Sequence, residues 1–439
     1  MNYQTFVSNT SPSMVEDGMA IIKSHYLNHS QFLPDGNPLK NNSVNAIKDY
    51  FDNRIVLSSD DVKAYMAASC IMHCFDGWLY LSHAVDSLLK GDKGIAIHLA
   101  YYSELRGCLS FLSRQGISVN DHQHIGIGNL GVIKCTKFNG THAASWDLLK
   151  AWINSNNVNH SVLLNYFSIR NITLFDWVNY VPYPITPTIA SKFTLDWLKE
   201  WNFDVLNYKK DRASRNIVSY RPQRLTDQSI MNFGKKLSGI INLWRFIEPN
   251  GTDKFALLDK YIFKILFDKI QTYLHHSIPT LSLNQLINDT FTNVGISTDP
   301  VIAHIVNSGA SHQIIDFSKN LTIQEPSGKL TPLTIISRAL LMLRISSGAA
   351  FDLLKSAGVT NDNIEFYLNP IGIENGHWKE ATPTNFEALW DDIEESIVSI
   401  EDLLADGDNV TLHDFYSNYS SELNKFKQVS RACFWGTCQ

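Results

Sequence analysis

Several features are scarce in this 439-residue sequence, and each scarcity excludes a class of protein. Six cysteines are too few for a disulfide scaffold, and 18% charged residues beside 11% aromatic residues exclude a disordered chain. The N-terminus lacks the basic start and apolar core of a signal peptide. No apolar run approaches the roughly 18 residues that a membrane helix needs. We therefore expect a folded cytoplasmic protein with no membrane partner.

The sequence also lacks the motifs of several enzyme classes. It contains no P-loop, no G-x-S-x-G and no H-E-x-x-H, so NTPases, serine hydrolases and zinc proteases have no support. Residues 126–131, GIGNLG, match G-x-G-x-x-G, but no apolar strand precedes them and no helix follows, so we interpret them as a turn. Cys70 and Cys74 flank His73 but have no second ligand pair, and we interpret them as small buried helix residues. We expect neither a metal nor another cofactor.

Hydrophobic periodicity predicts a mainly α protein with one small β-hairpin. The pattern predicts a helix over 59–91, with Ser59 as its N-cap and Gly91 as its end. A second helix runs to Gly116, and the extended runs after it are separated by Gly-Asn, as in a hairpin. Thr141 is predicted to cap the next helix. Further helices are expected at 229–247, 255–277, 331–358 and 385–408, whereas 278–332 is polar and weakly patterned.

These elements suggest three regions. We divide the chain into an N-terminal helical region at 1–90, a helical-bundle central domain with a hairpin insertion at 91–240, and a second helical domain at 241–439.

Charge is concentrated in two segments, although the net charge is only −6. Residues 205–245 hold nine Lys and Arg against two acids, and residues 361–408 hold thirteen acids against one lysine. A basic patch in an acidic chain is typical of a site for a phosphate-bearing partner. Alternatively, the two segments pair with each other. Candidate substrate-binding cations in the basic segment are Lys209, Lys210, Arg212, Arg221 and Arg224.

The segment 209–222, KKDRASRNIVSYRP, combines arginines with an amide and a phenol. If 212–220 is helical, Asn216 and Tyr220 lie one turn apart, and Pro222 ends the helix after Arg221. Guanidinium groups bind phosphate in a bidentate manner, so this cluster suits a phosphodiester. The alternative is a surface helix with ordinary ion pairs.

The motif RNIVSY resembles the R-N-x-x-x-H/Y signature of the HEPN superfamily. Residues 98–117 resemble the first long helix of that family, and THAASWDLLKAW and the Arg-Pro pair strengthen the likeness, which covers about 90–235. The resemblance implies a HEPN-like fold for the central domain. It also implies a metal-independent endoribonuclease, usually a homodimer, acting in bacterial anti-phage defence or as a toxin.

The same resemblance implies roles for individual residues. Arg215 would stabilise charge on the phosphate, Asn216 would hold the phosphate, and Tyr220 would be the acid–base group or would position the 2′-OH. Active family members mostly carry histidine where this chain has Tyr220, and tyrosine titrates near 10 rather than 6.5, which favours binding over turnover. Residues expected to support them are Glu104 and Arg106 beside Arg215, and His142 as a substitute proton acceptor.

Two other functions remain open from the sequence. In the first, the HEPN-like domain is a non-catalytic scaffold, a dimerisation unit or a nucleotide-sensing subunit of a defence complex. In the second, the chain is an adaptor that binds a nuclease through its acidic helix at 385–408. The expected partners are thus RNA, a second copy of the chain and a protein from the same defence operon.

Overall fold

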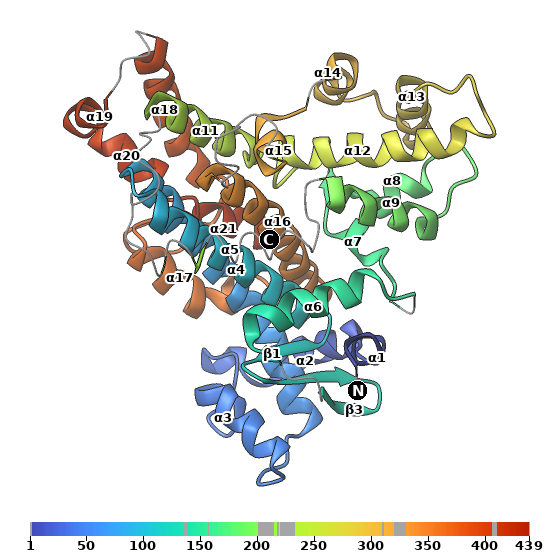
Figure 1. The fold of residues 1–439 in the computed structure, drawn as a ribbon, viewed down its shortest axis with the longest axis vertical. Helices are drawn as coiled ribbons and strands as arrows, with labels where there is room; N and C mark the ends of the chain where they lie inside the picture. The colour runs from blue at the N-terminus through green and yellow to red at the C-terminus, as the bar shows by residue number, and fades with distance from the viewer. Residues whose placement is uncertain are drawn as a thin grey trace.

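The chain is mainly helical with a small antiparallel sheet, as predicted (Figure 1). The sheet lies at one end of the molecule, beside the N-terminal helices, and the C-terminus lies near the centre. This computed structural model describes residues 2–135, 139–156, 158–200, 215, 216, 219, 233–309, 311–319, 331–405 and 411–438, with the side chains of 194 and 197–200 excepted.

Three long helices form the centre of the fold. Helices α4 (Ser59–Leu89) and α5 (Lys93–Arg114) pack against each other, and α16 (Pro332–Ser356) packs on both. Almost every residue of α16 is buried, which is expected of a helix that is apolar on all sides. Because these helices come from all three predicted regions, those regions share one core.

The remaining helices surround this centre. The N-terminal group comprises α1 (Tyr3–Ser8), α2 (Pro12–His25), the 3-10 turn η1 (Leu27–His29) and α3 (Leu39–Phe51). The middle group comprises α6 (Thr141–Ile153), α7 (Val162–Asn165), α8 (Leu174–Asn179), α9 (Pro187–Glu200), α11 (Phe233–Phe246), α12 (Ala256–His275), α13 (Leu283–Val294), α14 (Pro300–Ser308) and α15 (Gln313–Ser318). The C-terminal group comprises η2 (Asp362–Ile364), α17 (Glu365–Glu374), α18 (Ala388–Ala405), α19 (Leu412–Asn418), α20 (Ser420–Phe426) and α21 (Arg431–Thr437).

The predicted hairpin is present, and a third strand extends it. Strands β2 (Gln123–Gly128) and β3 (Gly131–Cys135) pair in antiparallel register and are joined by a turn at Asn129 and Leu130, so GIGNLG holds a hairpin turn between two strand ends. Strand β1 (Ile117–Asn120) pairs with the other edge of β2. A Cβ on Gly128 would overlap the carbonyl oxygen of Asn9, so this glycine lets the sheet approach the end of α1. A second, two-stranded ladder joins β4 (Ser168–Ile169) to β5 (Ile172–Thr173).

Two predicted helix caps were wrong by one residue. The N-cap of α4 is Ser58, whose Oγ accepts a hydrogen bond from the Asp61 amide at 3.0 Å, and Ser59 is already helical. The N-cap of α6 is Gly140, and Thr141 is the first helical residue. In both cases the cap is the last residue with extended backbone, which residue type alone does not identify.

The weakly patterned segment 278–332 holds three helices that the periodicity did not predict. Each begins at a residue whose side chain accepts a backbone hydrogen bond: Ser282 for α13, Asp299 for α14 and His312 for α15. These helices span only 12, 9 and 6 residues, so each offers few turns over which an apolar stripe can repeat.

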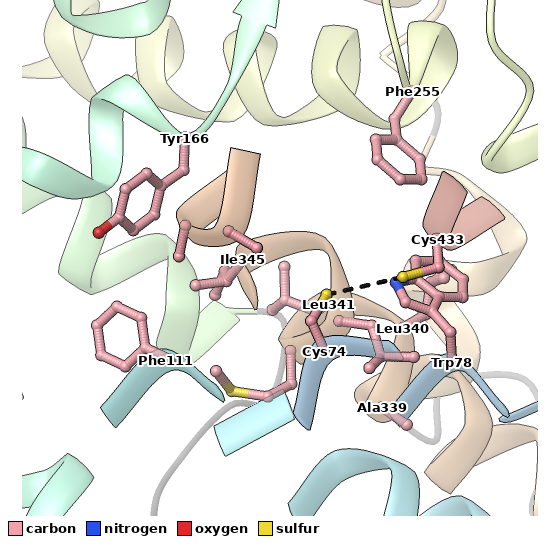
Figure 2. Packing of buried hydrophobic residues seen from close by; sticks show 14 of the residues in the cluster. Cys74, Trp78, Phe111, Tyr166, Phe255, Ala339, Leu340, Leu341, Ile345 and Cys433 are labelled. Carbon is pink, nitrogen blue, oxygen red and sulfur yellow. Dashed lines mark hydrogen bonds between the residues drawn. The ribbon is translucent and has the colours of Figure 1, made fainter. Parts of the chain in front are cut away.

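The core at the centre of the fold contains polar groups that pair within it (Figure 2). Cys74 of α4 and Cys433 of α21 are buried, and their Sγ atoms lie 4.0 Å apart. The Trp78 Nε1 donates to the Ser347 hydroxyl of α16 at 2.8 Å, which joins α4 to α16. Cys70 and Cys74 are buried on α4, which agrees with their interpretation as small core residues.

Helix α16 is the one element in the described part of the chain that is long and apolar enough to cross a membrane. Its most apolar stretch is completely buried inside the protein, as in the core helix of a soluble protein. Two arginines interrupt it, and both find partners: Arg338 donates to the Ser318 carbonyl at 3.0 Å, and Arg344 pairs with Asp259.

Candidate active site

Three residues of the RNIVSY motif are described, and all three are helical. Arg215, Asn216 and Ser219 have helical backbone, as in the helical arrangement considered for 212–220. The other predicted site residues of the basic segment lie outside the described part of the chain: Lys209, Lys210, Arg212, Tyr220, Arg221 and Arg224.

The Arg215 side chain lies on aromatic rings of α5. Its Cζ is 5.3 Å from the centre of the Tyr101 ring and 5.8 Å from that of the Tyr102 ring. Both distances are within the range of cation–π attraction. Only 9% of Arg215 is exposed, and its Nε has no hydrogen-bond partner within the described residues. A covered guanidinium donor without an acceptor is costly, so an acceptor placed beside this atom would stabilise the protein.

The aromatic face under Arg215 follows from helical spacing on α5. His98, Tyr101 and Tyr102 lie at positions i, i+3 and i+4, so they share one side of the helix. Tyr101 is fully buried, and His98 and Tyr102 are half-buried. The His98 and Tyr102 ring centres are 4.9 Å apart. The face therefore presents two rings toward solvent beside the arginine.

His98 is the functional candidate that the sequence analysis missed. Its Nδ1 lies 2.9 Å from the Ser219 hydroxyl oxygen, which joins α5 to the helical segment that carries Arg215. Burial, and then the charge of Arg215, lower the pKa of His98 below its usual value. The spacing of His98 to the two tyrosines was visible in the sequence, but its proximity to Ser219 was not.

His142 joins the same cluster from α6. Its Nδ1 lies 3.1 Å from the Tyr101 hydroxyl, and the two rings stack with their centres 5.7 Å apart. The Tyr102 ring meets His142 edge-on at 5.6 Å. His142 therefore lies beside the two tyrosines that hold Arg215, and its role as a substitute proton acceptor stays a prediction.

Arg106 and Glu104 do not share one environment. Arg106 turns toward α4, where its Nη1 lies 2.8 Å from Nδ1 of His73 and 3.4 Å from the Asp76 carboxylate. None of its described contacts is with Arg215. Glu104 is buried, with 4% of its surface exposed, two residues beyond Tyr102 on α5. Arg106 therefore supports the far end of the aromatic face rather than Arg215.

That aromatic face continues from α5 to α4. The rings of Tyr80 and Tyr102 are nearly parallel, with centres 5.8 Å apart, and the Arg106 Cζ lies 6.0 Å from the Tyr80 ring. The resulting row of rings has one arginine at each end, Arg106 and Arg215. Exposed rings beside cations bind single-stranded nucleic acid, because bases stack on the rings and phosphates pair with the cations.

Among the described residues of the basic segment, Arg245 pairs with the acidic C-terminal segment. Arg245 of α11 lies 3.4 Å from Glu401 and 3.9 Å from Glu394, both on α18. Asp392 on the same helix pairs with Arg431 at 3.2 Å. Some of the acidic charge is thus matched within the chain, as the alternative interpretation of the two segments required.

In the parts of the chain that are described, no three His, Cys, Asp or Glu side chains gather as a metal site would require. Comparisons with family models, curated proteins and solved structures found no match to this chain.

Proposed function

We propose that this protein is a metal-independent endoribonuclease whose active site is built around Arg215. The observation that carries the proposal is the position of this guanidinium. It rests on Tyr101 and Tyr102, with an Nε that lacks an acceptor in the described chain, beside the imidazoles of His98 and His142. Cation, aromatic rings and titratable groups together are what RNA cleavage requires.

The proposed reaction needs charge stabilisation and proton transfer. The ribose 2′-OH attacks the adjacent phosphorus and expels the 5′-oxygen, which leaves a 2′,3′-cyclic phosphate and a 5′-OH end. Negative charge builds on the non-bridging oxygens, and Arg215 stabilises it. Asn216, half-buried on the same helical segment, orients the phosphate. The half-buried Tyr102 ring stacks with an unpaired base.

The direct test is cleavage of total RNA by the purified chain in the presence of EDTA. We expect fragments with cyclic-phosphate ends, and we expect Arg215→Ala to remove this activity. Arg54→Ala is the matched control, because Arg54 is an exposed arginine on the loop after α3. RNA that stays intact at every protein concentration, or cleavage that survives Arg215→Ala, would refute the proposal.

The proposal includes a second copy of the chain. HEPN-like sites are composed across a dimer, and two basic segments brought together would need RNA to relieve their repulsion. We expect a dimer by light scattering, with RNA strengthening it. A role in bacterial anti-phage defence or as a toxin predicts that expression of the wild type, but not of Arg215→Ala, arrests growth.

One observation favours the non-catalytic alternative. Nine-tenths of the Arg215 surface is covered, partly by two tyrosine rings, as in an arginine that holds helices together. If the chain is a scaffold or a nucleotide-sensing subunit of a defence complex, Arg215→Ala will lower its thermal midpoint and RNA will remain intact with the wild type. Stable co-purification with a protein of the same operon would identify its partner.

A further inference from the structure

We propose that His98 is the proton acceptor of the site, in place of the histidine that the RNIVSY motif lacks. The inference rests on the proposed ribonuclease function and adds to it a catalytic residue on a different helix. It follows from where α5 brings the imidazole, from the hydrogen bond that orients it and from the groups around it.

The hydrogen bond to Ser219 fixes the orientation of the imidazole. Nδ1 of His98 lies 2.9 Å from the Ser219 hydroxyl oxygen, and the ring packs on Tyr102. In the tautomer in which Nδ1–H donates to that oxygen, Nε2 carries the lone pair. Nε2 has no hydrogen-bond partner in the described chain, and the environment of the bond is exposed. A substrate hydroxyl can therefore reach Nε2.

The charges near His98 favour its neutral form. Arg215 is the cation that faces it from the neighbouring segment, and Tyr102 is the titratable group packed on it from its own helix. Burial and Arg215 both lower the pKa of His98, so the imidazole is uncharged at neutral pH and ready to accept a proton. Arg215 thus stabilises the phosphate and keeps the neighbouring base neutral.

The other titratable groups of the cluster are less suited to this role. The hydrogen bond between His142 and the Tyr101 hydroxyl is part-buried and Tyr101 itself is fully buried, whereas the bond between His98 and Ser219 is exposed. A tyrosine hydroxyl titrates near 10, far above the pH at which a base should work. His98 combines an accessible nitrogen with an oriented ring.

Two proton transfers accompany the proposed cleavage. The 2′-OH gives its proton to Nε2 of His98 as its oxygen bonds to phosphorus. The bond from phosphorus to the 5′-oxygen breaks, and that oxygen takes a proton from water. The imidazolium then returns its proton to solvent, so the imidazole is regenerated and the net change is one cyclic phosphate and one 5′-OH.

His98→Asn tests this assignment, because asparagine can keep the hydrogen bond to Ser219 but lacks the outer nitrogen. With a labelled single-stranded RNA, we expect an unchanged Kd and a cleavage rate about 10²–10⁴-fold lower, as for loss of a general base. An RNA whose scissile 5′-oxygen is replaced by sulfur needs no proton on its leaving group, so the variant should stay slow on it. His25→Asn, an exposed histidine on α2, is the matched control.

The cleavage rates of the wild type and of His98→Asn distinguish the role of His98 from the ribonuclease function. If the wild type cleaves and His98→Asn cleaves equally fast, the assignment of His98 is wrong while the ribonuclease function stands. If the variant regains the wild-type rate on the sulfur substrate, His98 is the acid rather than the base. If the wild type cleaves nothing, both proposals fall. Circular dichroism and the Kd show whether the variant is folded. Because the pKa of His98 is lowered, the wild-type rate should fall with acid around a midpoint below the usual 6.5, which a purely structural histidine would not cause.

Discussion

Arg344 of α16 donates from Nε and Nη2 to the two carboxylate oxygens of Asp259 on α12, at 2.8 and 2.7 Å. Both side chains are buried, with 3% and 0% of their surfaces exposed. The guanidinium also lies between two rings, 4.7 Å from Phe167 and 4.8 Å from Phe255. This bidentate pair joins the central helix to the middle group of helices, and it is the most deeply buried ion pair among the described residues.

Asp259→Ala should destabilise the protein strongly. Removing one partner leaves the Arg344 charge buried without compensation, which costs about 3–5 kcal/mol. The midpoint of urea unfolding measures the loss. Asp49→Ala is the control, since Asp49 pairs with Arg54 at the surface and should cost no more than about 1 kcal/mol. Equal losses in the two variants would contradict a structural role for the buried pair.

Gly348→Ala should also be destabilising, because α16 passes very close to the chain around Tyr166. A Cβ at Gly348 would overlap the carbonyl oxygen and Cα of Tyr166, so backbone rather than the end of a flexible side chain would have to shift. Overpacking of this kind costs about 1–3 kcal/mol. Gly36→Ala is the matched control, because nothing lies within 4 Å of its added Cβ. A thermal midpoint unchanged by Gly348→Ala would show that this approach is looser than described.

The thiols should be inert in the native state. All six cysteines are buried and unpaired as disulfides. Burial alone would raise the pKa of Cys74, but hydrogen bonds from Cys433 and nearby hydroxyls lower it to about 7. The reaction of Cys74 with a reagent is therefore limited by the burial of its sulfur rather than by its ionisation. We expect a maleimide to label the native protein slowly and all six thiols quickly in urea. Mass spectrometry identifies the labelled thiols, and rapid native labelling of Cys70 would contradict the packing of α4.

His312 should make stability fall with acid. Burial lowers the pKa of His312 to about 4, and its ring stacks on Phe246 at 4.1 Å. In the unfolded chain His312 takes up a proton near pH 6.5, but in the folded chain it does so only near pH 4. The contribution of His312 to the free energy of unfolding is therefore complete above pH 6.5 and is lost as the pH falls toward 4. His312→Asn keeps a capping acceptor but does not titrate. Its urea midpoint should change less than that of the wild type between pH 7 and pH 5, and parallel pH profiles would refute the assignment.

Local sequence signals predicted much of the helical framework and the hairpin. The apolar positions of 59–89 and 93–114 recur with helical spacing, and Gly116, with a positive φ, ends the second helix as expected. The short helices between 283 and 318 were missed, because they span only 12, 9 and 6 residues, so an apolar stripe repeats over too few turns to stand out.

The candidate site could be predicted only in part. Arg215 and His142 were named from the sequence, and the structure brings both to Tyr101. Arg106 was expected beside Arg215, yet it turns to His73 and Asp76 on α4. His98 was not named at all. Which of two neighbouring faces of α5 meets the motif depends on how the helices pack, which the local pattern does not specify.

The sequence by itself determined the helical class, the extent of the long helices and the presence of arginines suited to phosphate, because propensity, periodicity and charge act over a few neighbouring residues. Only the tertiary structure decided that residues from 98 to 219 form one cluster, and that α16 joins helices from opposite ends of the chain. Such contacts depend on the shapes of whole buried faces, and residues far apart in the chain carry no local sign of them.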